Sequence, residues 1–249
     1  MLDGMIDSAQ YSLPQLDKER MLLEHLKVLT AHHASQCQEY QRIIKVMAPD
    51  YAAADQIEAL PYLPVALFKS HYLKSVPDQQ VHTILTSSGT TGQAVSRIAV
   101  DTETARYQSK ALAAIMQTVL GKRRLPMLVT DNRELLRDPT MLSARGAGVL
   151  GMMLFGHQHM FALNEDMSAN REALIAFLAR FGSEPFLVFG FTFMVWKYLL
   201  PAVSGLDLSN GILVHSGGWK KLTDEAVTND VFKATWEKET GLKHIHNFY

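Results

Sequence analysis

The segment Leu85-Thr86-Ser87-Ser88-Gly89-Thr90-Thr91-Gly92 lies between two stretches, residues 81–85 and 95–100, whose β-branched residues predict strands. Between residues 87 and 92, four hydroxyl side chains and two glycines provide a flexible backbone and many N–H and O–H donors. Such a row of donors suits an anion with several acceptor oxygens, such as a polyphosphate. The segment therefore predicts a nucleotide-binding loop, with an ordinary polar hairpin loop as the alternative.

The loop does not match two common phosphate-binding motifs. A P-loop requires Gly-x-x-x-x-Gly-Lys-Ser/Thr at the start of a helix, whereas Gln93-Ala94-Val95-Ser96 follow Gly92. It is not Gly-x-Gly-x-x-Gly either. Without the lysine, Arg97 is the nearest cation that could steady the outer phosphates.

The composition limits the possible classes of protein. At 249 residues, 47% hydrophobic and 20% charged, the chain can form one large or two small folded domains. Its 24 basic and 25 acidic residues nearly cancel, which argues against binding to nucleic acid or to an anionic membrane surface. We find no long apolar run and no basic N-terminal leader, and the single cysteine, Cys37, fits a reducing compartment. We therefore expect a cytoplasmic protein.

The periodicity of apolar residues predicts a helical region over residues 1–60 and an α/β region over residues 61–249, with Pro61 and Pro64 at the transition. Further strands are expected over residues 126–130, 157–161, 186–189, 212–215 and 244–249. Helices are expected after Asp101 or Thr102, over residues 141–155, 168–181 and 192–200, and after Thr223. The alternation predicts an α/β fold with layered sheets and flanking helices, and ligands at the carboxyl ends of the strands.

Signals at the ends of the predicted helices are specific enough to test. Ser168 and Thr223 are the predicted N-caps of two helices. Gly182, Pro201 and Gly241 are the predicted ends of three.

Three motifs, in the expected order, resemble those of the adenylate-forming enzymes. Residues 86–92 resemble their Thr/Ser-Ser-Gly-Thr-Thr-Gly phosphate signature. Residues 214–221, Val-His-Ser-Gly-Gly-Trp-Lys-Lys, resemble the strand and glycine turn that lie along the adenine. The final His246-Asn247-Phe248-Tyr249 resembles the start of their Tyr-Gly-x-Thr-Glu motif.

Within that superfamily the chain is most similar to the acyl-protein synthetase (LuxE-type) family. The similar segments are residues 60–65, 68–70, 189–193 and 215–221, together with a phosphate loop not followed by Pro-Lys. The resemblance implies an acid–thiol ligase that uses ATP and Mg²⁺ to convert a fatty acid into an acyl-adenylate. The acyl group would then pass to a protein thiol and to an acyl-reductase partner. The alternatives are an aryl- or acyl-CoA ligase, or an inactive nucleotide-binding or scaffold fragment.

The resemblance also implies site residues, whereas no catalytic residue can be named. The phosphate set is Thr86, Ser87, Ser88, Gly89, Thr90, Thr91 and Gly92. The adenine set is Gly217, Gly218, Trp219, Asn247 and Tyr249. The acyl-pocket set is Phe189, Phe191, Thr192 and His215, with Phe193 beside it. Turn and core roles remain the alternatives for the glycines and the aromatic residues, respectively.

Three further features bear on function. His157-x-His159 and His244-x-His246 could each place two imidazoles on one strand face, but with no carboxylate at metal spacing we predict no metal site. Cys37 is expected to be a structural residue on a helix, because the family's acyl-accepting cysteine lies nearer the C-terminus. The chain ends where the family's catalytic motif would begin, so we expect an N-terminal fragment with weak or no adenylation activity of its own.

Overall fold

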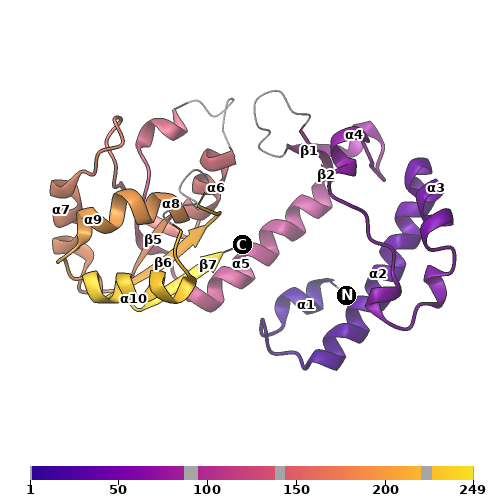
Figure 1. Cartoon of the computed structure of the whole chain (residues 1–249), viewed down its shortest axis with the longest axis horizontal. Coiled ribbons are helices and arrows are strands. Elements are labelled where there is room, and N and C mark those ends of the chain that lie inside the picture. The colour runs from indigo at the N-terminus through magenta and orange to yellow at the C-terminus, as the bar shows by residue number, and fades with distance from the viewer. Residues whose placement is uncertain (1, 87–94, 138–143, 220–225, 249) are drawn as a thin grey trace. The chain divides into compact units, whose positions relative to one another are not determined.

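A computed structural model describes residues 2–86, 95–137, 144–219 and 226–248 (Figure 1). The chain forms two compact units, residues 1–115 and 116–249, and the boundary falls within helix α5 (Thr102–Leu120). Each unit is considered by itself below. The predicted domain boundary near residue 60 stays a prediction.

The first unit begins with helices, as predicted. They are α1 (Leu2–Asp7), α2 (Gln15–Gln36), α3 (Gln38–Met47) and α4 (Leu67–Ser70), with short 3-10 helices η1 (Tyr51–Ala53), η2 (Ile57–Ala59) and η3 (Asp78–Gln80). Cys37 is 5% exposed and lies at the junction of α2 and α3, so its predicted placement within a helix was wrong. Strands β1 (Val81–Thr86) and β2 (Arg97–Asp101) form an antiparallel pair, which confirms the strands predicted on either side of the hydroxyl-rich loop.

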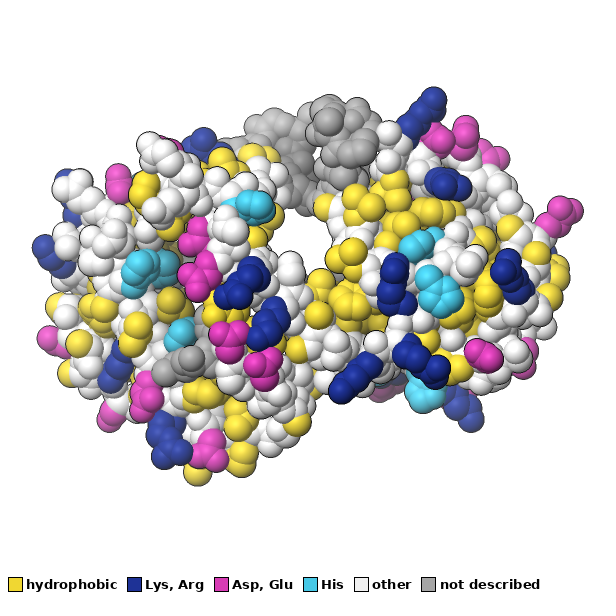
Figure 2. Space-filling model, turned by 180° about the vertical axis from the view of Figure 1, so that it is seen from behind, with side chains coloured by type: hydrophobic (Ala, Val, Ile, Leu, Met, Phe, Trp, Pro, Cys, Tyr) yellow, Lys and Arg dark blue, Asp and Glu magenta, His cyan; other side chains and the backbone are white. Residues whose placement is uncertain are grey.

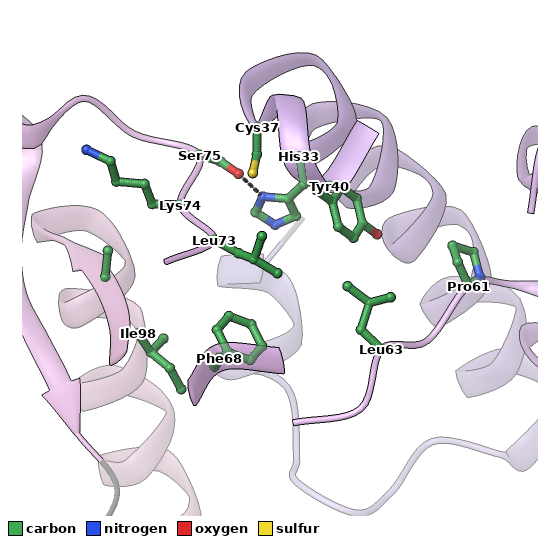
Figure 3. Close-up of a pocket in the computed structure, with 11 residues that line it drawn as sticks. His33, Cys37, Tyr40, Pro61, Leu63, Phe68, Leu73, Lys74, Ser75 and Ile98 are labelled. Atoms are coloured by element: carbon green, nitrogen blue, oxygen red, sulfur yellow. Dashed lines mark hydrogen bonds between the residues drawn. The ribbon is translucent and has the colours of Figure 1, made fainter. Parts of the chain in front are cut away.

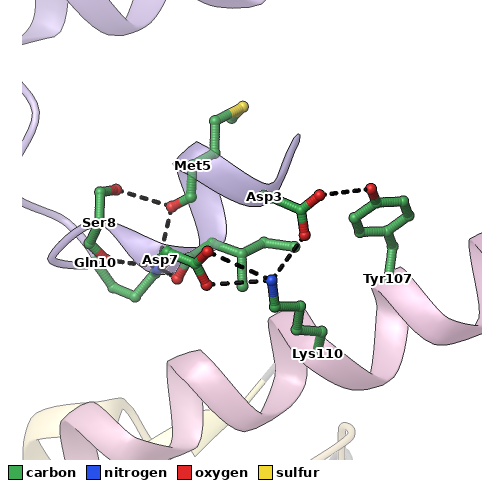
Figure 4. Close-up of polar contacts among 8 residues, drawn as sticks. Asp3, Met5, Asp7, Ser8, Gln10, Tyr107 and Lys110 are labelled. Atoms are coloured by element: carbon green, nitrogen blue, oxygen red, sulfur yellow. Dashed lines mark hydrogen bonds and ion pairs between the residues drawn. The ribbon is translucent and has the colours of Figure 1, made fainter. Parts of the chain in front are cut away.

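Two sets of polar contacts organise α5 within the first unit. The Asp101 carboxylate accepts a hydrogen bond of 2.7 Å from the Thr104 backbone N–H, which caps the helix and lowers the pKa of Asp101. Further along the helix, Lys110 Nζ lies 2.7 Å from Asp3 Oδ1 and 3.2 Å from Asp7 Oδ1, and Tyr107 donates to Asp3 (Figure 4). The hydrogen bond from Lys110 is the main cause of the lowered pKa of Asp3. These contacts join α1 to α5.

The second unit is built on a five-stranded parallel sheet with strand order β4-β3-β5-β6-β7. The strands are β3 (Leu125–Val129), β4 (Gly156–Phe161), β5 (Phe186–Phe191), β6 (Gly211–Ser216) and β7 (His244–Phe248). The connecting helices are η4 (Arg133–Leu136), α6 (Ala144–Met153), α7 (Arg171–Phe181), α8 (Thr192–Met194), the π-helix η6 (Val195–Leu199), α9 (Leu200–Val203) and α10 (Asn229–Thr240).

Apolar side chains on both faces of this sheet are buried, which explains the nearly continuous apolar sequence of the strands. On one face, Leu128, Val188 and Leu213 pack in one cluster with side chains of α7, α9 and α10. On the other face, Met127 and Phe189 are also buried, and α6 packs against β4 and β5. The layered α/β prediction is confirmed.

Several predicted helix ends were wrong. The N-cap of α7 is Asn170, whose side chain accepts from Ala173 N–H at 3.0 Å, because the Ser168 hydroxyl is already bonded to Asp166 at 2.6 Å. Pro201 does not end a helix, because the helical backbone runs without a gap from α8 through η6 to Val203, and the wider π-helical turn lies directly before the proline, which has no N–H to donate. Thr228 caps α10, and the predicted cap Thr223 lies outside the described residues.

Other end signals were correct. Gly241 ends α10 with φ of 74°, a left-handed conformation that glycine adopts without strain, and Gly182 ends α7. Acidic and basic side chains are interspersed over the surface shown in Figure 2, in keeping with their nearly equal numbers. Among the described helices, none has both the length and the apolar character needed to cross a bilayer.

Candidate active site

The polar residues of the second unit gather where its parallel strands end. All five strands run in the same direction, so their carboxyl ends meet at one edge of the sheet. β3 leads to Thr130 and Asp131, and β5 leads to Thr192. β6 carries His215 and leads to Gly217. Edges of this kind are the usual ligand-binding location in α/β folds.

A single hydroxyl joins two of these strand ends. Thr192 Oγ1 lies 2.6 Å from the Gly217 carbonyl oxygen, 3.2 Å from that of Ser216 and 2.9 Å from His215 Nδ1. A threonine hydroxyl has one proton, and the shortest contact assigns it to the Gly217 carbonyl. The imidazole then donates from Nδ1 to the threonine oxygen, which fixes both the ring and the turn.

His215 is held in its neutral form. Its side chain stacks on Phe232 with ring centroids 4.6 Å apart, and the residue is 2% exposed. Burial, followed by repulsion from Lys233, lowers the pKa of His215 to about 4. Its Nε2 atom is buried and has no hydrogen-bond partner among the described residues. Buried polar atoms without a protein partner are uncommon in folded proteins.

The turn after β6 requires glycine. Gly217 has φ of 76°, and a Cβ at this position would lie 3.3 Å from the Phe191 ring. Gly218 is exposed, and a Cβ there would meet no atom within 4 Å. Gly217 is therefore required by its backbone conformation and by the neighbouring Phe191 ring, whereas the open side of the turn lies at Gly218.

The structure adds one pair that the sequence analysis missed. Asp131 is fully buried two residues after the end of β3, and its Oδ2 lies 3.2 Å from Nε of Arg145 on α6. Asn132 N–H donates to the other carboxylate oxygen at 2.9 Å. The sequence held a signal for this pair, because an aspartate that follows an apolar strand into the interior is rarely buried without a partner.

The predicted adenine set is only partly brought together. Asn247 of β7 is paired with His215 of β6, and the next residue, Phe248, is paired with Ser216 at the end of β6. Trp219 packs edge-on against Trp196 at 5.6 Å and against Phe232 at 6.3 Å. Its indole therefore contributes to the apolar core, and its contact with adenine stays a prediction. Tyr249 lies outside the described residues.

The predicted acyl-pocket residues are neighbours. Phe189 and Phe191 contact edge-to-face with centroids 6.1 Å apart, and Thr192 bonds to His215. Phe189 is 2% exposed, so it contributes to the core in this structure. Phe193 packs against the apolar cluster on the other face of the sheet, which contains Leu128 and Val188. Binding of an acyl chain by these residues stays a prediction.

Of the predicted phosphate set, only Thr86 is described, and the remainder, Ser87 to Gly92, lies outside the described residues. Thr86 ends β1 and is paired with Arg97 in the β1–β2 register. The Arg97 guanidinium lies over the Tyr72 ring at 5.0 Å from its centroid. The cation closest to the loop in the sequence is therefore already stacked on an aromatic ring.

Neither histidine pair forms a metal centre with a third ligand within the described part of the chain. His157 and His159 flank Gln158, whose φ of 50° interrupts the regular alternation on which the prediction of a shared strand face depended. His159 Nε2 lies 3.0 Å from the Met153 carbonyl oxygen. Burial is the main cause of the lowered pKa of His246, followed by repulsion from His244.

The fold of the chain is that of an adenylate-forming ligase. It is similar to the solved structure of a 2-hydroxyisobutyryl-CoA ligase in an open conformation in complex with 2-HIB-AMP and CoA. The TM-score is 0.65 at 16% identity, over 97% of this chain and 52% of that chain, so the chain spans about half of that ligase. The family model for acyl-protein synthetase, LuxE, matches residues 1–248, and the chain belongs to that family. No curated protein sequence matches it significantly.

Proposed function

We propose that the chain takes part in the ATP-dependent activation of a carboxylic acid, most naturally a fatty acid. A carboxylate oxygen of the acid attacks the α-phosphorus of ATP, the bond to the β-phosphate breaks, and pyrophosphate leaves with that electron pair. The product is an acyl-adenylate, whose AMP is a much better leaving group than oxide. Positioning and charge neutralisation dominate the catalysis of such a step.

The membership of the LuxE family carries this proposal, and the arrangement around Gly217 supports it. Within the proposal, Thr86 and residues 87–92 bind the phosphates, with Mg²⁺ carried largely by phosphate oxygens. Gly217 and Gly218 lie along the adenine, Asn247 binds its amino group, and Tyr249 and Trp219 contact its ring system. Phe189, Phe191, Thr192 and His215 border the acyl group.

A neutral His215 suits this role. A protonated imidazole would form an ion pair with the substrate carboxylate and weaken it as a nucleophile. The lowered pKa of His215 keeps the ring uncharged at neutral pH. The hydrogen bond between Thr192 and the Gly217 carbonyl holds the turn in one conformation before the nucleotide arrives. Preorganisation of this kind reduces the cost of binding.

The acceptor of the acyl group is proposed to be a protein thiol, followed by an acyl-reductase partner. Coenzyme A is the second candidate, because the fold is similar to that of a CoA ligase. The two are separated by giving the chain a pre-formed acyl-adenylate together with CoA and, in parallel, together with a C-terminal segment of a LuxE-family protein that carries the acceptor cysteine. Acyl-CoA in the first reaction or an acylated protein in the second identifies the acceptor.

The proposal is tested with the 249-residue chain in two assays. The first measures calorimetric binding of AMP and of a non-hydrolysable acyl-adenylate analogue. We expect the analogue to bind more tightly than AMP, because it fills both the nucleotide and the acyl positions. The second measures acid-dependent exchange of labelled pyrophosphate into ATP, which we expect to be weak or absent in this chain alone. If neither AMP nor the analogue binds, the proposed function is wrong.

A further inference from the structure

A cavity of about 400 Å³ lies entirely within the first unit. Its wall is formed by the α2–α3 junction, the segment from Pro61 to Phe68, residues 73–75 and strand β2 (Figure 3). Cavities that bind small molecules typically enclose about 300–1,000 Å³. Among the described residues assigned above to the phosphates, the adenine or the acyl group, none lines this cavity.

One part of the wall is apolar. Leu63 and Phe68 supply side chains from the segment that begins at Pro61, Leu73 from residues 73–75, and Ile98 from β2. Ile98 is 39% exposed, so this apolar surface is accessible to a ligand. Covering such surface stabilises a complex by about 25 cal/mol for each Å² of apolar area removed from water.

The other part of the wall is polar and rich in donors. His33 Nδ1 lies 2.7 Å from the Ser75 hydroxyl, and in Figure 3 the second ring nitrogen points toward the side of the cavity lined by Leu73. Lys74, the neighbour of Ser75 in the chain, also lines the cavity; its ammonium is paired with the carboxylate of Asp78 and points away from His33 in Figure 3. The Lys74 side chain is 23% exposed and that of Asp78 is 80% exposed, so the cation is the more enclosed partner.

The charges around the cavity favour an anion. The residues described as lining it include a lysine and a histidine but neither aspartate nor glutamate. The pKa of His33 is lowered, mainly by burial and then by repulsion from His32, so an anionic ligand would meet a neutral ring able to donate a hydrogen bond. Asp78 holds the Lys74 cation from an exposed position and can be displaced by a ligand at little cost.

We propose that this cavity is a binding site for a medium-chain monocarboxylic acid. The alkyl chain lies against Leu63, Phe68 and Leu73, and the carboxylate lies beside His33 and Ser75, where the Lys74 ammonium reaches it by turning away from Asp78. The site is additional to the reaction centre proposed above and does not depend on it. It gives the first unit its own means of holding a carboxylic acid.

Cys37 provides a specific reporter for this site. It is the single cysteine of the chain, it is 5% exposed, and it lines the cavity. The experiment measures the rate of Cys37 alkylation by N-ethylmaleimide, followed by intact mass, with and without decanoate. Decanoate at ten times its dissociation constant should slow alkylation by about tenfold if the alkylated species excludes the ligand. No ATP is present, so the outcome is separate from that of the activation assay.

Chain length and head group test the two ends of the cavity. From butanoate to decanoate, each added methylene should tighten binding by up to about fourfold until the cavity is full. Lys74→Met should weaken protection by decanoate and leave protection by decanol unchanged. Protection by decanol that equals or exceeds that by decanoate in the unaltered chain would overturn the assignment of a carboxylate.

Matched tryptophan substitutions locate the binding. Leu63→Trp fills the cavity and should abolish both the calorimetric heat of decanoate binding and any protection. Val65→Trp, at a position 70% exposed on the same segment, should leave both unchanged. Circular dichroism checks that each variant is folded, and the chain-length series in the unaltered protein stands if Leu63→Trp does not fold. Absence of both heat and protection in the unaltered chain, or equal binding to a folded Leu63→Trp variant, refutes the proposal.

Discussion

The hydroxyl oxygen of Thr192 lies 2.6 Å from the carbonyl oxygen of Gly217, which ties the residue directly after β5 to the turn directly after β6. The same oxygen lies 2.9 Å from His215 Nδ1. One side chain therefore sets the position of a backbone turn, the orientation of an imidazole and its tautomer. Loss of this hydroxyl should disturb all three together.

Thr192→Val removes the hydroxyl while nearly preserving the shape of the side chain. The Gly217 carbonyl and the His215 N–H then lack this buried partner, and we expect a loss of about 1–3 kcal/mol in the free energy of unfolding. Urea denaturation measures this change. Thr192→Ser, which keeps the hydroxyl, is the control and should keep most of the stability that the valine variant loses. Equal losses in the valine and serine variants would show that the hydrogen bonds contribute nothing and that packing of the methyl group decides the effect.

Gly217→Ala and Gly218→Ala form a matched pair on one turn. At Gly217 the left-handed backbone costs an L-residue about 1–2 kcal/mol, and the new Cβ would lie 3.3 Å from the Phe191 ring. At Gly218 a Cβ meets nothing within 4 Å, and the exposed position should tolerate alanine.

The measurement for this pair is thermal unfolding, followed by titration with AMP. We expect a lowered midpoint and weaker binding for Gly217→Ala only. If Gly218→Ala instead weakens AMP binding without lowering stability, the nucleotide contacts the backbone at Gly218 rather than at Gly217.

The strand-and-helix alternation and the sites of the glycine turns could be predicted from the sequence, because they follow from local patterns. The apolar run at residues 186–189 and the Gly217 turn are examples, since neither depends on a distant partner. The bond from Thr192 to Gly217 could not be predicted, because it joins residues 25 apart that meet only through the register of β5 and β6.

The roles of three other residues could not be predicted for the same reason: each depends on a neighbour that only the folded chain provides. Ser168 is a favourable N-cap by composition, but Asp166 engages its hydroxyl first. Trp219 follows a turn typical of a ligand site, yet its indole contacts Trp196, which only the folded chain brings near. Asp131 is recognised as one member of a buried pair only when α6 places Arg145 beside it.

The stability of the second unit should depend on pH through His215. Burial lowers its pKa from 6.5 to about 4, so the unfolded chain binds a proton more readily between these values. The contribution of neutral His215 to stability is complete above pH 6.5 and is lost as the pH falls toward 4. A shift of this size corresponds to on the order of 3 kcal/mol.

The control for this prediction is His215→Gln, which cannot titrate. Unfolding by urea is measured for both proteins between pH 7 and pH 4, and the difference between the two curves isolates His215 from His33 and His246, whose pKa values are lowered in the same direction. Stability that falls with pH equally in both proteins would assign the dependence to the other groups.

Two arginines in the second unit differ in the burial of their partners, which makes them a matched test. Arg145 Nε lies 3.2 Å from Asp131, whose side chain is 1% exposed, whereas Arg137 Nη1 lies 2.8 Å from Glu134, whose side chain is 41% exposed. Arg145→Met leaves a buried carboxylate without its cation, so we expect a cost at the low end of about 3–5 kcal/mol, because Arg145 itself is partly exposed. Arg137→Met should cost at most about 1 kcal/mol, since water replaces the cation around Glu134.

Adding Asp131→Asn to Arg145→Met removes the buried charge and should recover much of the loss, as measured by a double-mutant cycle in urea. Similar costs for the two arginine variants, or no recovery in the double variant, would mean that the Asp131 carboxylate is stabilised mainly by its other neighbours, such as Asn132 N–H.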